Sequence, residues 1–302
     1  MTVCIATICT LPNRILGIVG MSDRMLTAGD VEFEPPQQKV YSLAPRAPRA
    51  AILVAGNIPA QISICDAVGP QLPEIEGTED TEIRIIADVY ATEYIKYRQR
   101  ESETVILSPL GLTLESFLSR QKDMAPDQVQ RLTNELRRYD FDPEAIICGV
   151  DARGPHIFTV HNPGVVQCHD PIAFAAIGIG ARHAESQFMF SRYVRDWPLS
   201  HALLLSYSAK RRAEAAPGVG TGTDVLFIEP HGQGIIAVSD AIRRKLDRIY
   251  RKTVRREETT ADAARVEIDG FINSILNPAP PEVPTVPTIS PPTTPPGGDV
   301  TG

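Results

Sequence analysis

Short apolar runs separated by turn-forming residues recur in both halves of the chain and predict β-strands. Pro12-Asn13-Arg14, for example, separates the first two runs. Apolar blocks or alternations of about four to eight residues, bounded by such residues, are typical of strands. The predicted strands are residues 2–9, 15–22, 38–43 and 50–55, then 145–150, 156–161, 165–168, 173–177, 223–229 and 234–238.

Apolar residues at helical spacing lie between and after these strands. Pro59 is predicted to open one helix, and Asp80 to cap a longer one that runs to about residue 101. Two more helices are predicted near 181–195 and 199–214. Two blocks of strands flanking two blocks of helices favour an α+β protein. We therefore expect residues 1–238 to form a four-layer αββα sandwich.

Three segments depart from this pattern. Residues 103–141 hold two helical pieces and predict an insertion, which is either an extra surface for assembly or for shaping a pore, or a hairpin covering the domain edge. Residues 239–276 predict a basic amphipathic helix. Its charges suit either an acidic partner, a membrane surface or RNA, or a solvated helix face. Residues 277–302 are rich in proline and predict a disordered tail.

Composition narrows the class of protein. The 302 residues, 43% of them hydrophobic, are ample for one large core, and the net charge of −7 argues against nucleic-acid binding. Five cysteines in apolar runs are expected to be reduced and buried, as in a cytoplasmic protein. The N-terminal residues do not have the pattern of a secretory signal, and no apolar run is long enough to span a membrane.

Three residues offer chemistry at the edges of predicted strands. Thr2 follows Met1, so removal of Met1 would leave a hydroxyl and a free α-amine on one residue. An α-amine has a pKa of about 7.7–8.0 and can act as a general base near neutral pH. Asp23 and Lys39 each lie at the end of an apolar run. A lysine held by a carboxylate could lower the barrier to deprotonating the hydroxyl.

Several ordered stretches, with their spacing kept, are similar to one known family. They are Ile18-Val19-Gly20-Met21-Ser22-Asp23-Arg24-Met25-Leu26-Thr27-Ala28-Gly29, Lys39-Val40-Tyr41-Ser42-Leu43, Val54-Ala55-Gly56-Asn57, Ala145-Ile146-Ile147-Cys148-Gly149-Val150-Asp151, Gly154-Pro155-His156-Ile157-Phe158, Ala176-Ile177-Gly178-Ile179-Gly180 and Gly222-Thr223-Asp224-Val225-Leu226-Phe227-Ile228. With the opening Thr2 strand, they resemble the proteasome β-subunit family of N-terminal-nucleophile hydrolases, including its bacterial members without a propeptide.

The resemblance implies a role for each matching residue. Thr2 matches the nucleophile, Lys39 the lysine that supports it electrostatically, and Asp23 the acidic partner of that lysine. It also implies self-assembly into a ring or stacked rings and a peptide or protein substrate. We expect neither a cofactor nor a metal. An ATPase or a partner for the tail stays open. The residues expected to contact substrate are Thr27, Ile52, Gly56 and Ile179.

Some positions depart from the family pattern. Active members usually have a serine where Ile179 stands, and an aspartate and a serine in the stretch matching residues 215–220. Those side chains orient the terminal amine, so their absence leaves it less well held unless Glu214 or a water replaces them. The glycine that donates to the oxyanion is expected near Ile52 and Leu53, which are bulky.

Three functions are compatible with the sequence. The first is a threonine-type peptidase or amidohydrolase that uses Thr2. The second is a catalytically inactive, proteasome-like structural subunit, which the residues at 179 and 215–220 favour. The third is an amidase of the same superfamily that acts on a small molecule. A metal site built on His156, His161 and His169 is not favoured, because strand alternation points their side chains in different directions.

Overall fold

The computed structural model describes residues 2–28, 31–34, 39–72, 81–230 and 234–277. The strands are β1 (Cys4–Thr10), β2 (Leu16–Asp23), β3 (Leu26–Ala28), β4 (Val31–Phe33), β5 (Val40–Leu43), β6 (Ala47–Ala55), β7 (Glu144–Asp151), β8 (Gly154–His161), β9 (Val165–Cys168), β10 (Phe174–Ile177), β11 (Thr223–Ile228) and β12 (Ile235–Ala237). The α-helices are α1 (Ile58–Val68), α2 (Ile83–Ser102), α3 (Leu114–Ser119), α4 (Pro126–Arg138), α5 (Ala181–Phe190), α6 (Leu199–Ala213) and α7 (Asp240–Leu276).

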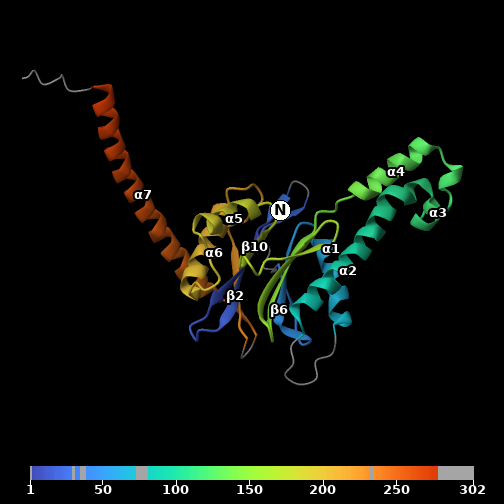
Figure 1. Cartoon of the computed structure of the whole chain (residues 1–302), viewed down its shortest axis with the longest axis horizontal. Coiled ribbons are helices and arrows are strands. Elements are labelled where there is room, and N and C mark those ends of the chain that lie inside the picture. Colours follow the sequence, from blue (N-terminus) through green and yellow to red (C-terminus); the bar gives the residue numbers. More distant parts are fainter. Residues whose placement is uncertain (1, 29–30, 35–38, 73–80, 231–233, 278–302) are drawn as a thin grey trace, which may run out of the picture. The chain divides into compact units, whose positions relative to one another are not determined.

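Two five-stranded antiparallel sheets form the centre of the fold. Their strand orders are β10-β1-β2-β11-β12 and β5-β6-β7-β8-β9. Helix α6 contacts β1 and β2 of the first sheet, while α2 contacts β7 and β8 of the second (Figure 1). The predicted α+β class is therefore confirmed. The short β3–β4 hairpin was not predicted, and it lies beside the candidate site described below.

The central strands are buried on both faces, which explains their continuous apolar runs. On β6, Ala51 and Leu53 belong to the core that also contains β1 and β2. The alternate residues Ile52 and Val54 belong to the core beneath α1 and α2. Successive side chains of a strand point to opposite faces, so one strand contributes to both cores.

The insertion predicted at 103–141 is helical. Helix α2 continues through a π-helical turn at Glu103–Leu107, and α3 and α4 follow. Leu107, Phe117 and Leu132 are buried together and form a small core separate from the two larger ones. This cluster explains how the insertion stays ordered beyond the sheets (Figure 1).

Two local expectations need correction. Asp80, the predicted cap of α2, lies outside the described residues; the helix begins at Ile83, whose amide donates to Asp151 Oδ2 at 3.0 Å. Cys168 was expected to be buried, but it is exposed, because it ends the edge strand β9. The other four cysteines are buried.

The chain divides into two units, Met1–Tyr250 and Arg251–Gly302. The first turns of α7 belong to the first unit, where Leu246 is buried and Tyr207 Oη donates to Asp247 Oδ1 at 3.1 Å. The rest of α7 is the described part of the second unit. The Pro-rich tail after Asn277 lies outside the described residues. No helix in the described ranges has the length and apolar character needed to cross a membrane.

Candidate active site

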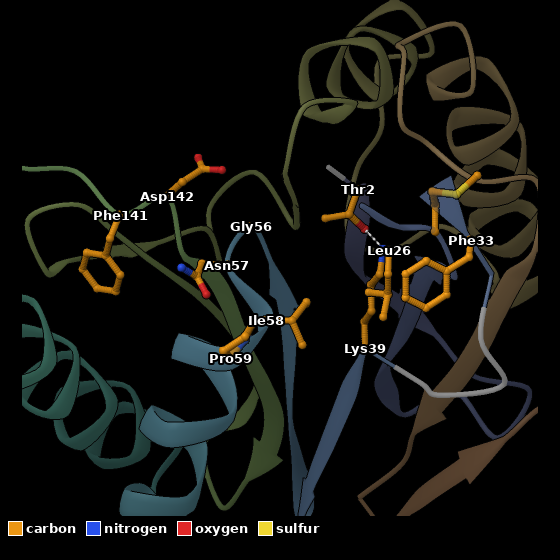
Figure 2. Close-up of a pocket in the computed structure, with 11 residues that line it drawn as sticks. Thr2, Leu26, Phe33, Lys39, Gly56, Asn57, Ile58, Pro59, Phe141 and Asp142 are labelled. Carbon is orange, nitrogen blue, oxygen red and sulfur yellow. Dashed lines mark hydrogen bonds between the residues drawn. The ribbon is translucent and has the colours of Figure 1, made fainter. Parts of the chain in front are cut away.

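Thr2, Asp23 and Lys39 come together although they belong to different parts of the chain. Thr2 precedes β1, Asp23 ends the neighbouring strand β2, and Lys39 precedes β5 of the other sheet. Lys39 Nζ donates hydrogen bonds to Thr2 Oγ1 and, at 2.9 Å, to Asp23 Oδ1. Thr2 Oγ1 in turn donates to Asp23 Oδ1. Figure 2 shows the Lys39 side chain reaching the Thr2 hydroxyl.

The Asp23 carboxylate is fully buried and well supplied with donors. Its Oδ1 accepts from the Val3 amide at 2.9 Å, in addition to Thr2 and Lys39. Its Oδ2 accepts from the amides of Met25 at 2.9 Å and Gly220 at 3.0 Å. A buried charge needs such partners, and together they hold the carboxylate in one position. Hydrogen bonds to Asp23 therefore connect Lys39 with the start of β1, the end of β2 and the segment around Gly220.

The Lys39 side chain is 3% exposed, and its ammonium is in direct contact with the Thr2 oxygen. A positive charge that contacts the Thr2 oxygen and is shielded from water favours negative charge on that oxygen. The hydroxyl of Thr2 is thus placed where its deprotonation would be assisted. The ion pair with Asp23 keeps the ammonium in place.

A second buried lysine supports the segment that holds Asp23. Lys210 on α6 donates to Glu214 Oε1 at 2.7 Å and to the carbonyl oxygens of Gly220 and Thr221 at 2.8 and 3.0 Å. Burial lowers the pKa of Lys210, and the bond to Glu214 opposes this shift. Glu214, which was expected to replace the missing side chains near the terminal amine, instead accepts hydrogen bonds from Lys210 and Arg211. Lys210 was not predicted from the sequence, although its place three residues after the apolar Tyr207 on α6 was a usable signal.

A pocket of about 600 Å³ opens beside Thr2. Figure 2 shows Thr2 and Lys39 on one side of it, and the Gly56–Pro59 turn with Phe141 and Asp142 on the other. Its lining residues are Thr2, Met25, Leu26, Phe33, Lys39, Gly56, Asn57, Ile58, Pro59, Phe141 and Asp142. Most of the wall is apolar, with the hydroxyl and the ammonium at one end. Pockets with a few polar groups among apolar walls are typical of ligand sites.

Gly56 shapes the far wall of this pocket. Its φ of +85° is in the left-handed region, and a Cβ there would lie 1.6 Å from the carbonyl oxygen of Asp142. The next residue, Asn57, caps α1 by accepting from the Ala60 amide at 3.1 Å. Only glycine allows this close approach of the Gly56 and Asp142 segments.

Asp142 also lines the pocket. Burial, together with the negative charge of nearby Asp140, raises the pKa of its carboxyl group.

Replacing Gly56 with alanine should lower the free energy of unfolding by about 3 kcal/mol or more, because strain and a backbone clash add together. Gly111→Ala is a matched control. Gly111 also has a positive φ, +69°, but nothing lies within 4 Å of its would-be Cβ. We expect the control to cost about 1 kcal/mol. Urea unfolding followed by the fluorescence of Trp197 measures both, and equal losses would contradict the close-approach argument.

The other residues expected to contact substrate are placed differently. Ile52 is fully buried in the core beneath α1 and α2, so it does not line the pocket; the glycine at its wall is Gly56, at the end of β6. Ile179 is 50% exposed in the turn after β10 and is not among the lining residues. Thr27 lies on β3, and its side chain is outside the described part of the structure.

Cys4 and the histidines have structural partners. The Cys4 thiol donates to the Val54 carbonyl at 3.3 Å, and burial raises its pKa to about 12, so it does not compete as a thiolate. His156 Nδ1 pairs with Asp170 Oδ2 at 2.7 Å, and His169 Nε2 with Thr159 Oγ1 at 2.9 Å. Among the residues that the structure describes, no three His, Cys, Asp or Glu side chains gather as a metal site.

The sequence matches no model of a known protein family and no curated protein. The geometry around Thr2 and the resemblance carried by the motifs are therefore what supports a function.

Proposed function

We propose that this protein is a threonine hydrolase of the proteasome β-subunit type, with Thr2 as its nucleophile after removal of Met1. The observation that carries the proposal is the Lys39 ammonium, which donates to Thr2 Oγ1 while Asp23 holds it. The pocket beside Thr2 provides room for a substrate. The two antiparallel sheets, with helices packed on them, are compatible with the four-layer αββα sandwich that we infer.

The reaction we propose begins at the free α-amine. The amine takes the proton of the Thr2 hydroxyl, and Lys39 stabilises the developing charge. Oγ1 then forms a bond with the carbonyl carbon of an amide. The Gly56 backbone N–H is the candidate oxyanion donor, because Gly56 lies at the same pocket. The C–N bond breaks, the leaving amine takes the proton, and water hydrolyses the ester to restore Thr2.

The proposed substrate is a peptide or protein, and the proposed assembly is a ring or stacked rings. Enclosure in a ring would keep such a site away from folded proteins. The apolar wall formed by Met25, Leu26 and Phe33 suits an extended chain with apolar side chains. Comparing turnover of short peptides with that of small amides separates this proposal from a small-molecule amidase.

Intact mass and N-terminal sequencing test the proposal directly. We expect Met1 to be absent, because threonine is small enough for aminopeptidase removal of the methionine. A peptidyl epoxyketone, which reacts with the hydroxyl and the free amine of an N-terminal threonine, should then add to Thr2. Retained Met1, or a processed chain that forms no adduct, would refute the mechanism.

A second candidate, a catalytically inactive structural subunit, has its own support. Thr2 is 1% exposed, and its hydroxyl donates to the Asp23 carboxylate. The segment where active relatives carry an aspartate and a serine has the buried apolar residues Ala216 and Val219. These features suit a threonine that holds two strands together. A processed N-terminus without any adduct would favour this candidate.

A further inference from the structure

A buried lysine lies behind the candidate active site, in the last turn of α6. The Lys210 side chain is fully buried, and its ammonium donates to Glu214 Oε1 at 2.7 Å and to the carbonyl oxygens of Gly220 and Thr221 at 2.8 and 3.0 Å. An ammonium has three N–H donors, so each of them has an acceptor inside the protein. The lysine therefore binds the backbone of residues 219–222, the Gly220 segment.

Carboxylates bind the same segment through its amides. The Gly220 amide donates to Asp23 Oδ2 at 3.0 Å, and the Gly222 amide donates to Glu34 Oε1 at 3.0 Å. A Cβ on Gly220 would lie 2.7 Å from Met25 Cβ and 2.9 Å from Met25 N, so the segment fits closely beside the residues that follow Asp23. The Gly220 segment is thus held through its carbonyl groups by a cation and through its amides by carboxylates.

The Gly220 segment also packs beside a residue that binds Thr2. The Gly180 amide, at the start of α5, donates to the Thr2 carbonyl oxygen at 3.3 Å. A Cβ on Gly180 would lie 3.1 Å from Val219 Cγ2. Displacement of the Gly220 segment would therefore disturb both the Asp23 carboxylate and the backbone around Thr2.

Fold stability alone does not require a lysine at position 210. Burying an ion pair costs desolvation energy, and replacing such a pair by apolar side chains is often neutral or stabilising. Burial lowers the pKa of Lys210, which reflects this cost, while the bond to Glu214 opposes the shift. An apolar side chain would fill the same space, but it could not donate to the carbonyl groups of Gly220 and Thr221.

We propose, on the basis of the function proposed for Thr2, that Lys210 is a positioning residue for hydrolysis. Lys210 fixes the Gly220 segment, and the amide of that segment fixes one oxygen of the Asp23 carboxylate. The other oxygen of Asp23 holds Lys39 against the Thr2 hydroxyl. Lys210 is not among the residues that line the pocket beside Thr2, so its effect falls on the chemical step rather than on substrate binding.

The first experiment removes the charges of the buried pair while keeping apolar side chains in their place. In full-length Lys210→Met/Glu214→Leu, the midpoint of urea unfolding should stay close to that of the wild-type chain. Titration with the peptidyl epoxyketone counts the competent sites, so a partly unfolded preparation does not mimic the effect. We expect kcat per competent site to fall by about 10- to 100-fold, the scale of a small misplacement of catalytic groups, with KM changed by less than about twofold.

Arg211→Met is the matched control. Arg211 donates to the same Glu214 oxygen at 3.1 Å, but its side chain is 23% exposed, against 0% for Lys210. This variant should keep the wild-type kcat and KM. Equal losses of kcat in the two variants, or an unchanged kcat per competent site in the double variant, would overturn the proposal. A wild-type chain that forms no adduct refutes the proposed function and the positioning role with it, whereas an adduct with unchanged kcat refutes the positioning role alone.

The second experiment follows the Gly220 segment without using turnover. Hydrogen exchange measured by mass spectrometry reports on the backbone amides of residues 216–223. Exchange there should be about tenfold faster in Lys210→Met/Glu214→Leu than in the wild-type chain or in Arg211→Met, because the lost bonds to the carbonyl groups let the segment open. Exchange at the wild-type rate would mean that Lys210 does not fix the segment, and the proposal would be wrong whatever the turnover.

Discussion

Replacing Thr2 with valine should abolish amide hydrolysis. Valine keeps the shape of threonine but has no hydroxyl, so neither the Lys39 ammonium nor the amine has an oxygen to activate. We expect turnover to fall by roughly four orders of magnitude, the scale of losing a nucleophile in other covalent hydrolases. The Asp23 carboxylate keeps Lys39 and three backbone amides as partners, so the fold should survive.

The matched control is Thr2→Ser, which keeps both the hydroxyl and the amine. Valine and serine are small, so Met1 should be removed from both variants, and intact mass verifies this before turnover is compared. Serine should retain measurable turnover and form the epoxyketone adduct, whereas valine should show neither. If Thr2→Val hydrolyses the substrate as fast as the wild-type chain, Thr2 is not the nucleophile.

The residues around Thr2 could be identified from sequence because they lie at strand ends. Asp23 closes β2 of one sheet, and Lys39 immediately precedes β5 of the other, so the packing of the two sheets against each other brings them to one place. Their direct contacts with Thr2 are shown by the structure. The sequence could not show which distant residues surround Asp23 and Lys39. The Gly220 amide on Asp23 and the Lys210 ammonium behind it come from residues nearly two hundred positions away in the chain.

The resemblance placed one expected substrate contact away from the pocket. The expected oxyanion glycine was assigned near Ile52, but β6 extends to Ala55, and Gly56 follows it. Strand residues alternate between two cores, so Ile52 is directed away from the pocket. A glycine directly after the apolar run 50–55 was the better signal, because glycine is favoured where the backbone turns sharply.

The fold class was predictable for a physical reason. Sheets buried on both faces need continuous apolar strands, and the runs on β6 and β7 supply them. The three-residue strands β3 and β4 were too short to leave a periodic pattern. The exposed cysteine at 168 shows the limit of composition, because edge position, rather than residue type, decided its burial.

Replacing Asp23 with asparagine should greatly reduce stability. The amide group turns one acceptor oxygen into an NH₂ donor, which would face donors such as the amides of Met25 and Gly220. It also leaves the Lys39 ammonium buried without its counter-charge. Removing one partner of a buried ion pair typically costs about 3–5 kcal/mol. Urea unfolding followed by Trp197 fluorescence should show a loss of that size, with turnover lost as well.

Two comparisons make this result specific to the buried pair. Asp88→Asn removes the same charge from the exposed Arg84–Asp88 pair on α2 and should cost less than about 1 kcal/mol. The double variant Asp23→Asn/Lys39→Met removes both charges, so it should be more stable than the sum of the two single losses predicts. Additive losses would mean that Asp23 stabilises the fold through its backbone amides alone. The Lys39 contact would then support the reactivity of the Thr2 hydroxyl and not the stability of the fold.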